Sequence, residues 1–330
     1  MSMPGMMDTV LNLGLNDQSI NGLIKQTENP RFAWDSYRRF IQMFSNVVMG
    51  LDGDLFENAI NLMKRSRGVE TDTDLSAEDL QELVAEFKKI FSENVDAAEY
   101  PSLVVDGAVQ FPQSPDVQLQ LAIEAVFGSW NNPRAILYRK QNKISDDLGT
   151  AVNVQSMIFG NKGNTSATGV AFTRNPANGE KEFYGDYLVN AQGEDVVAGI
   201  RNTSPIAELK ETPGLEEAGR ELEEVFTILE NHFRDMCDIE FTIEQGKLWM
   251  LQTRVGKRTA AAALHIAIEM EQEGLITKEE AVQRVDPEQL DQLLHPQFDA
   301  KADYDVVAKG LNCLLYTSPS PRDRSLSRMP

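Results

Sequence analysis

Cysteine and histidine are scarce in this 330-residue chain, which limits the sites that they could form. The two cysteines, Cys237 and Cys313, are too few for a disulfide framework and have no partner residues at metal-ligand spacing. We expect Cys237 to be a small buried residue. The three histidines lie in helical patterns or in a turn and look ordinary.

Basic residues are also in the minority. The chain has 31 Lys and Arg against 51 Asp and Glu, a formal net charge of -20. Nucleic-acid binding would require local basic patches to overcome that field, and the globular part of the sequence shows none. No apolar run approaches the roughly 20 residues that span a bilayer, and the start lacks a signal-peptide pattern. We therefore expect a soluble, cytoplasmic protein that binds neither nucleic acid nor a membrane.

The chain has the composition of a globular protein, with 42% hydrophobic and 25% charged residues, and a length that predicts about two domains or one elaborated domain. Residues 17–95 show helical periodicity, and Ser76 and Asp79 form a capping-box pattern before an apolar stripe. This block is predicted to be all-helical. Two shorter helices are expected over residues 117–127 and 133–142, the second beginning at a proline.

From residue 150 the pattern changes to that of strands. We predict strands at residues 151–159, 168–174 and 183–189, with a turn at residues 175–179. Helices are then expected over residues 215–234, from residue 260, and after the start signals at Thr277 and Asp286. The residue pattern thus predicts an α+β protein.

The clearest strand pattern covers residues 238–254, where apolar and polar residues alternate on both sides of Gly246, as in a β-hairpin. A three-residue loop with Gly246 in the left-handed conformation would pair Ile243 with Lys247. A two-residue loop would slip the pairing by one and place Gln252 beside apolar residues, so we predict the longer loop. That register gives an apolar face of Ile239, Phe241, Trp249 and Leu251, and a polar face of Asp238, Glu240 and Gln252, with Arg254 beyond.

The polar face of this hairpin could bind a cation and phosphates. Asp238 and Glu240 share a strand face and can jointly hold a hard cation such as Mg²⁺ through oxygen ligands. Gln252 and Arg254 can meet nucleotide phosphates. An ordinary amphipathic hairpin with its polar face toward solvent explains the same residues at least as well, so both interpretations stay open at this point.

Two loops carry weaker signals for phosphate binding. Residues 160–166 include small hydroxyls and one lysine, Lys162, followed by Gly163, and could turn backbone N–H groups and an ammonium onto phosphate oxygens. Their spacing matches neither the P-loop nor the dinucleotide fingerprint, which favours a plain hairpin loop. Residues 192–195 could lend a carboxylate such as Glu194 to a site, although a helix start that favours acidic residues is the simpler explanation.

The last part of the sequence is unlike the rest. Periodicity is lost beyond about Leu311, and residues 315–330 are basic and rich in Ser, Pro and Arg, whereas the body is acidic. A natural basic tail is one explanation. We favour a read-through from vector or adapter sequence, and therefore exclude this tail from the fold prediction.

Several motifs in a fixed order carry a family resemblance. They lie at residues 2–9, 29–39, 168–176, 190–195 and 251–254. Together they closely resemble the pyruvate, phosphate dikinase family, over residues 2–312. The resemblance implies two ATP-grasp lobes closing on ATP, and hence a partial ATP-grasp domain with an antiparallel sheet and an all-helical insert.

The resemblance also implies a division of the chain into parts with different roles. These are a remnant of the first ATP-grasp lobe (residues 1–15), a helical insert (16–101), a nucleotide-binding lobe (102–260), a helical linker toward a phosphohistidine domain (261–312) and a tail foreign to the family (313–330).

Members of this family convert ATP, pyruvate and phosphate into AMP, phosphoenolpyruvate and pyrophosphate, using Mg²⁺, a monovalent cation and a histidine on a separate swivelling domain. For this chain the resemblance implies catalytic roles for Asp238, Glu240 and Gln252, with Asp238 and Glu240 as the metal ligands. Further ATP contacts are expected from Gly5, Met7, Gly169, Glu194, Arg254 and the lysine of loop 160–166. The full-length family is commonly homodimeric.

Some features of the family are missing from this sequence, including its glycine-rich, lysine-bearing segment and its Thr-Ser-His segment. We therefore expect a fragment that cannot complete the reaction alone. One alternative is a related dikinase such as phosphoenolpyruvate synthase, which the motifs at residues 2–9 and 29–33 disfavour. Another is a non-catalytic module whose acidic helical insert binds a partner.

Overall fold

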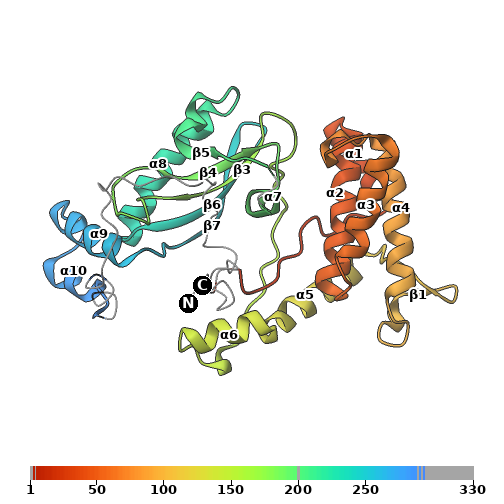
Figure 1. Ribbon diagram of the computed structural model, residues 1–330, viewed down its shortest axis with the longest axis horizontal. Coiled ribbons are helices and arrows are strands. Elements are labelled where there is room, and N and C mark those ends of the chain that lie inside the picture. Colours follow the sequence, from red (N-terminus) through yellow and green to blue (C-terminus); the bar gives the residue numbers. More distant parts are fainter. Residues whose placement is uncertain (1–2, 4, 199–200, 288–289, 291–292, 294–330) are drawn as a thin grey trace, which may run out of the picture. The chain divides into compact units, whose positions relative to one another are not determined.

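The computed structural model describes the chain except for residues 1–2, 4, 199–200, 288–289, 291–292 and 294–330. Its contacts divide the chain into two compact units, Met1–Met157 and Ile158–Pro330 (Figure 1). The described residues combine helices with antiparallel sheet, which confirms the α+β class. Among them, none of the helices has the length and apolar composition needed to cross a membrane.

The first unit is mainly helical, as predicted. It contains α1 (Ser19–Thr27), α2 (Pro30–Met43), which continues into a π-helical turn (Phe44–Val48), α3 (Asp54–Arg67), α4 (Ala77–Asn94), α5 (Pro115–Gly128) and α6 (Pro133–Gln141). A small hairpin joins β1 (Val104–Val105) to β2 (Ala108–Val109). The capping box of α4 is confirmed, because Ser76 Oγ accepts from Asp79 N at 3.1 Å and Asp79 Oδ2 accepts from Ser76 N at 3.0 Å.

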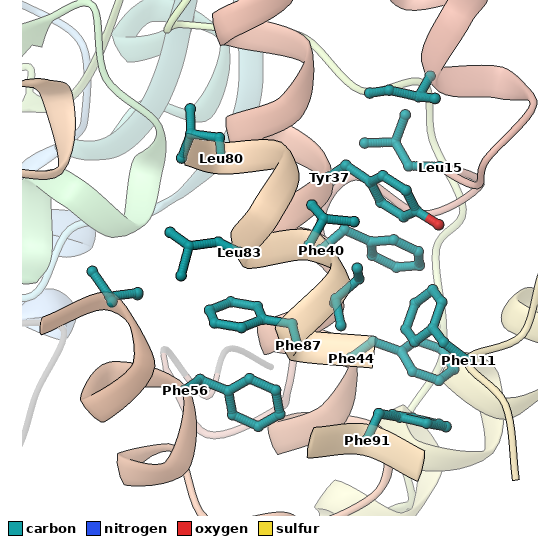
Figure 2. Close-up of a cluster of buried hydrophobic side chains, with 14 of the residues drawn as sticks. Leu15, Tyr37, Phe40, Phe44, Phe56, Leu80, Leu83, Phe87, Phe91 and Phe111 are labelled. Atoms are coloured by element: carbon teal, nitrogen blue, oxygen red, sulfur yellow. The ribbon is translucent and has the colours of Figure 1, made fainter. Parts of the chain in front are cut away.

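Aromatic side chains dominate the core of this unit, as Figure 2 shows. The ring of Phe111 meets Phe40, Phe44 and Phe91 edge to face, at centroid separations of 5.6, 5.5 and 5.3 Å. Such edge-to-face pairs are the preferred geometry of aromatic contacts. Since Phe111 follows α4 by many residues, the segment after the helical block is packed into the same core.

The second unit is built on one antiparallel sheet with the strand order β5-β4-β3-β6-β7 (Figure 1). Its strands are β3 (Ala167–Phe172), β4 (Tyr184–Val189), β5 (Ser204–Pro205), β6 (Cys237–Glu244) and β7 (Lys247–Val255). Its helices are α7 (Gly193–Ala198), α8 (Glu216–Phe233), α9 (Ala260–Gln272) and α10 (Lys278–Arg284). The strands predicted near residues 168 and 183, the turn at residues 175–179 and the helix start at Thr277 are thereby confirmed.

Helices pack on both faces of this sheet. On one face the buried side chains of β3 and β6 pack against α8, through residues such as Phe241 and Phe226. On the other face α7 packs near Leu188 and Val170, and α9 packs near Phe172. Cys237 lies in the α8 core at 1% exposure, so the prediction of a buried residue is correct.

The strand predicted over residues 151–159 is wrong. That segment is irregular, most of it is exposed, and Val154 is 65% exposed. A strand is stable only beside a partner and over a hydrophobic layer, and this segment has no ladder in the described sheets. Residues 160–166 are therefore not a hairpin loop. Cys313, His295 and the tail lie outside the described residues, as does most of the segment after Asp286.

Candidate nucleotide and cation site

The hairpin of β6 and β7 turns in two residues, so the predicted three-residue loop is wrong. Glu244 pairs with Lys247 across Gln245 and Gly246, whose φ angles are 51° and 80°. Two successive positive φ angles are those of a type I′ turn, whose twist matches that of the flanking strands. The left-handed conformation expected at Gly246 is present.

A β-bulge then restores the polar face that the sequence predicted. The pairing shifts between Phe241, which lies opposite Met250, and Glu240, which lies opposite Gln252, so that Leu251 is the additional residue. Beyond the bulge Asp238 lies opposite Arg254. The structure thus places the four predicted polar residues, Asp238, Glu240, Gln252 and Arg254, on one face.

The apolar half of the hairpin prediction is wrong in two positions. Trp249 lies opposite Thr242, which shares the face of Glu240, and its side chain is 38% exposed. Leu251 is the bulged residue and is 37% exposed. Leu248 instead lies opposite Ile243 and is buried. The physical reason is the two-residue turn, which shifts Leu248 and Trp249 by one position, and the bulge at Leu251, which shifts the pairing back; the sequence pattern shows neither.

Arg254 lies between the two carboxylates of this face. Its Nε is 3.3 Å from Asp238 Oδ2, and its Nη2 donates to Glu240 Oε1. The side chains of Arg254 and Asp238 are only 11% and 16% exposed. Burial raises the pKa of Asp238, and the neighbouring Glu240 adds to this, while Arg254 acts in the opposite direction. The face is therefore an acidic pair whose charge is partly neutralised by one guanidinium.

A third carboxylate, Asp186, lies on the same face of the sheet and was not singled out from the sequence. The pairing sets Asp186 opposite Val170, Val170 opposite Glu240, and Glu240 opposite Gln252, in one row across four strands. Burial raises the pKa of Asp186. The alternation of β4 indicates which of its residues lie on the same side as Asp186. Only the strand pairing shows that this side is also the face of Glu240.

The residues of this face suit a hard cation in their chemistry. Asp238 and Glu240 offer carboxylate oxygens, and both already contact one cationic group, the Arg254 guanidinium. In proteins Mg²⁺ is commonly held by one or two carboxylates together with substrate phosphates and water. Among the described residues there is no group of three or more His, Cys, Asp or Glu that could hold a metal.

Gly169 lies on the opposite face of the sheet, next to the α8 core. It is paired with Phe241, and a Cβ placed on Gly169 would lie 2.6 Å from the Phe241 ring and 2.7 Å from Asp186 O. The close packing of that ring over β3 is a structural reason for glycine at this position.

The loop of residues 160–166 is tied to the hairpin turn and to the end of β4. Lys162 pairs with Glu244 and is 9% exposed, and Gly163 N donates to Asn190 Oδ1 at 3.1 Å. Gly246 N donates to Thr165 O at 2.7 Å. The ammonium that the sequence offered as a phosphate contact is thus held in an ion pair at the hairpin turn.

The other predicted ATP contacts lie on separate elements. Glu194 is half-buried in the first turn of α7, whose start is capped by Asp195 Oδ2 accepting from Gln192 N at 2.9 Å. Gly5 and Met7 belong to the first unit, where Gly5 has a φ of 66°. The structure therefore brings Asp238, Glu240, Gln252 and Arg254 together on β6 and β7, whereas Lys162, Gly169 and Glu194 lie on other segments of the second unit.

Comparison with known proteins identifies relatives over nearly the whole chain. The model of the family "Pyruvate phosphate dikinase, AMP/ATP-binding domain" matches residues 1–219 and 208–275. Pyruvate, phosphate dikinase of Rhizobium meliloti (strain 1021) is 57% identical over 320 residues, covering 94% of this chain and 34% of the relative. The protein of the same name from Clostridium symbiosum is 57% identical over 301 residues, covering 91% and 33%.

A chloroplastic plant relative shows the same extent of similarity. Pyruvate, phosphate dikinase 1 of Arabidopsis thaliana is 54% identical over 312 residues, covering 94% of this chain and 31% of the relative. The chain thus spans about a third of the length of these curated relatives. With a family model that matches most of its residues and relatives above 50% identity, the chain belongs to the pyruvate phosphate dikinase family, through its AMP/ATP-binding domain.

Proposed function

We propose that this chain is the ATP-binding part of a pyruvate, phosphate dikinase and that its second unit is the nucleotide-binding lobe of an ATP-grasp domain. The observation that carries the proposal is the common face of Asp238, Glu240, Gln252 and Arg254. Phosphoryl transfer depends mainly on positioning and on positive charge near the phosphates, rather than on a protein nucleophile. Two carboxylates, an amide and a guanidinium on one sheet face are suited to that task.

In this proposal the two carboxylates bind Mg²⁺, which supplies positive charge for the phosphates of ATP. Arg254 is held by Asp238 and Glu240 in the structure. A cation bound to these carboxylates would compete with the guanidinium for the same oxygens, so Arg254 would turn part of its hydrogen bonding to a phosphate. Gln252, opposite Glu240 and exposed, would orient a phosphate oxygen through its amide.

The complete protein would transfer phosphoryl groups from ATP to phosphate and, through a phosphohistidine, to pyruvate. The products would be AMP, pyrophosphate and phosphoenolpyruvate. The proposal rests on the family membership and on the names of the relatives, each of which is a pyruvate, phosphate dikinase. The same names argue against phosphoenolpyruvate synthase.

The test is nucleotide binding by this chain, measured by calorimetry with a non-hydrolysable ATP analogue in the presence and absence of Mg²⁺. The variant Asp238→Asn/Glu240→Gln removes both charges with little change of shape. A matched control is Glu221→Gln/Glu224→Gln, which removes two charges from exposed positions of α8. We expect Mg²⁺-dependent affinity to fall at least about tenfold in the first variant, as for lost metal contacts, and to stay unchanged in the control.

Two results would count against the proposal. Equal affinity in the wild type and in the Asp238→Asn/Glu240→Gln variant would show that this face does not bind the metal-nucleotide complex. Binding that does not depend on Mg²⁺ would indicate that the carboxylates serve another purpose, since two acidic groups repel a triphosphate unless a cation lies between them.

A further inference from the structure

The start of α6 departs from the usual pattern of a helix N-terminus. Asn132 occupies the N-cap position, yet its side chain makes no capping hydrogen bond to the helix. The first turn has no acidic residue and instead carries Arg134. Helix N-termini favour an Asn side chain that caps the backbone and an anion near the first turn. The residues at the start of α6 therefore supply neither the side-chain cap nor the anion.

Asp8, more than a hundred residues earlier in the chain, supplies the missing anion. Its Oδ1 pairs with Arg134 Nη2, and its Oδ2 accepts from Asn132 Nδ2 at 3.1 Å. Arg134 Nε also donates to Met6 O at 3.4 Å. The Asp8 side chain is 17% exposed. The Asn132 side chain that would ordinarily cap the helix is thus used to hold a carboxylate from a distant loop.

A second contact fixes the loop of residues 5–8 to the 3₁₀ turn Ser129–Asn131, which precedes α6. Asp8 N donates to Ser129 Oγ at 3.2 Å, and that oxygen lies 3.7 Å from the sulfur of Met7. Ser129 is 1% exposed, and its hydroxyl donates to Val126 O at 2.6 Å. The loop is therefore attached to a buried hydroxyl that is itself fixed to α5.

The anchoring turn is braced from its other side by Arg139. The guanidinium of Arg139 stacks on the Trp130 ring at 4.1 Å, donates to Trp130 O, and pairs with Asp146 Oδ1 at 2.6 Å. The Arg139 side chain is only 3% exposed. Because packing locks the side chains of Trp130 and Arg139, the turn holds the attached loop that carries Asp8 in one position.

We propose that Asn132 and Arg134 form a clamp on Asp8 that positions the loop of residues 5–8, and that this clamp sets nucleotide affinity. The inference rests on the proposed function and on the expectation, implied by the family resemblance, that Gly5 and Met7 of this loop contact ATP. Asn132 and Arg134 are positioning residues, because they act through Asp8 and the loop. A loop that carries a ligand contact must be held in place before binding, since ordering it at the moment of binding weakens affinity.

The test compares Arg134→Gln and Asn132→Ala/Arg134→Gln with wild type in two measurements. Hydrogen exchange of residues 5–9, read by mass spectrometry, reports the clamp without nucleotide. Calorimetry with Mg²⁺ and a non-hydrolysable ATP analogue reports its consequence. Because the Arg134 side chain is 47% exposed, we expect the single variant to raise exchange about threefold, and the double variant about tenfold, with affinity reduced in parallel.

Two further variants separate the clamp from a general loss of stability. Arg134→Lys keeps the positive charge beside Asp8 and should retain most of the protection and affinity. Arg67→Gln removes an arginine from α3 that pairs with Asp79 and Glu82 in the same unit, and it should change neither measurement.

The outcomes distinguish this inference from the proposed function. Unchanged exchange in the double variant would overturn the clamp. Faster exchange with unchanged affinity would show that the clamp holds the loop but does not set binding, and would overturn the inference. Absence of nucleotide binding by the wild type would overturn the proposed function and the binding half of this inference, while the exchange result would still decide whether the clamp exists.

Discussion

Arg174, at the end of β3, is a fully buried guanidinium that joins α8 and α9 to the sheet. Its Nε and Nη2 donate to the two oxygens of Glu230 on α8, each at 2.9 Å. Its Nη1 donates to Glu269 on α9 at 2.9 Å, and Nη2 donates to Glu273 at 2.8 Å. Since α8 and α9 pack on opposite faces of the sheet, one residue fixes both. We expect Arg174→Met to be among the most destabilising changes in the second unit.

The loss of stability in Arg174→Met is set by the carboxylates that lose their partner. Without Arg174, the Glu230 side chain, 7% exposed, keeps Thr173 Oγ1 at 3.1 Å and Lys181 Nζ at 3.8 Å. Removing one partner of a buried ion pair costs about 3–5 kcal/mol. Glu269 and Glu273 are each 30% exposed and can regain water, so we expect a value near the lower limit, about 3 kcal/mol.

The assay is urea unfolding at pH 7, with hydrogen exchange of the α8 and α9 peptides to assign the transition to the second unit. The double variant Arg174→Met/Glu230→Met removes the stranded carboxylate and should be less destabilised than Arg174→Met alone. A cost below about 1 kcal/mol for Arg174→Met, or a double variant worse than the single one, would refute the reasoning.

The effect of Arg174→Met should also depend on pH. Burial acts to raise the pKa of Glu273, but hydrogen bonds from Lys181 and Arg174 outweigh it, so the pKa lies below its ordinary value. A depressed carboxyl pKa contributes stability that is present above the unfolded pKa and is lost as the pH falls through the folded one. The difference between wild type and variant should therefore shrink below about pH 4.

Three further predictions test individual positions of the second unit. Burial raises the pKa of Asp186, so its ionised form costs stability and Asp186→Asn should raise the thermal midpoint at pH 7. This gain should shrink as the pH falls and disappear below about pH 3, where both states are protonated. Burial also raises the pKa of the Cys237 thiol, to about 12, so in a Cys313→Ser background a thiol reagent should react at pH 8 only after urea unfolds the chain. Gly169→Ala should cost about 1–3 kcal/mol in thermal melts without nucleotide, because its Cβ meets the Phe241 ring, whereas Gly22→Ala, in open space on α1, should not destabilise.

Local signals in the sequence predicted the helices well. The helix starts at Ser76 and Thr277 have both hydrogen bonds of a capping box, and each depends on residues only three positions apart. The proline that begins α6 acts in the same way, since the effect of proline on the chain is local. The strand predicted over residues 151–159 failed because alternation alone provides neither a partner strand nor a layer to cover it.

In the site, too, the sequence indicated the residue types but not the strand pairing. The residue types of the hairpin indicated a polar face of Asp238, Glu240, Gln252 and Arg254, and the structure places them together. That result depended on two errors that compensate: the turn is one residue shorter than predicted, and a bulge at Leu251 supplies the missing residue. Turn length and bulge position are decided by strand pairing and packing, which the alternation of one segment does not encode.

The sequence by itself determined the helix starts at Ser76, Pro133 and Thr277, the polar residues of the hairpin and the family of the chain, because these depend on neighbouring residues or on motifs in order. Tertiary structure alone decided that Asp186 shares a face with Glu240, that Arg174 joins α8 and α9, and that Asp8 completes the start of α6. Each of these relations joins residues far apart in the chain. They follow from strand pairing and from the need of a buried charge for a partner, wherever in the sequence that partner lies.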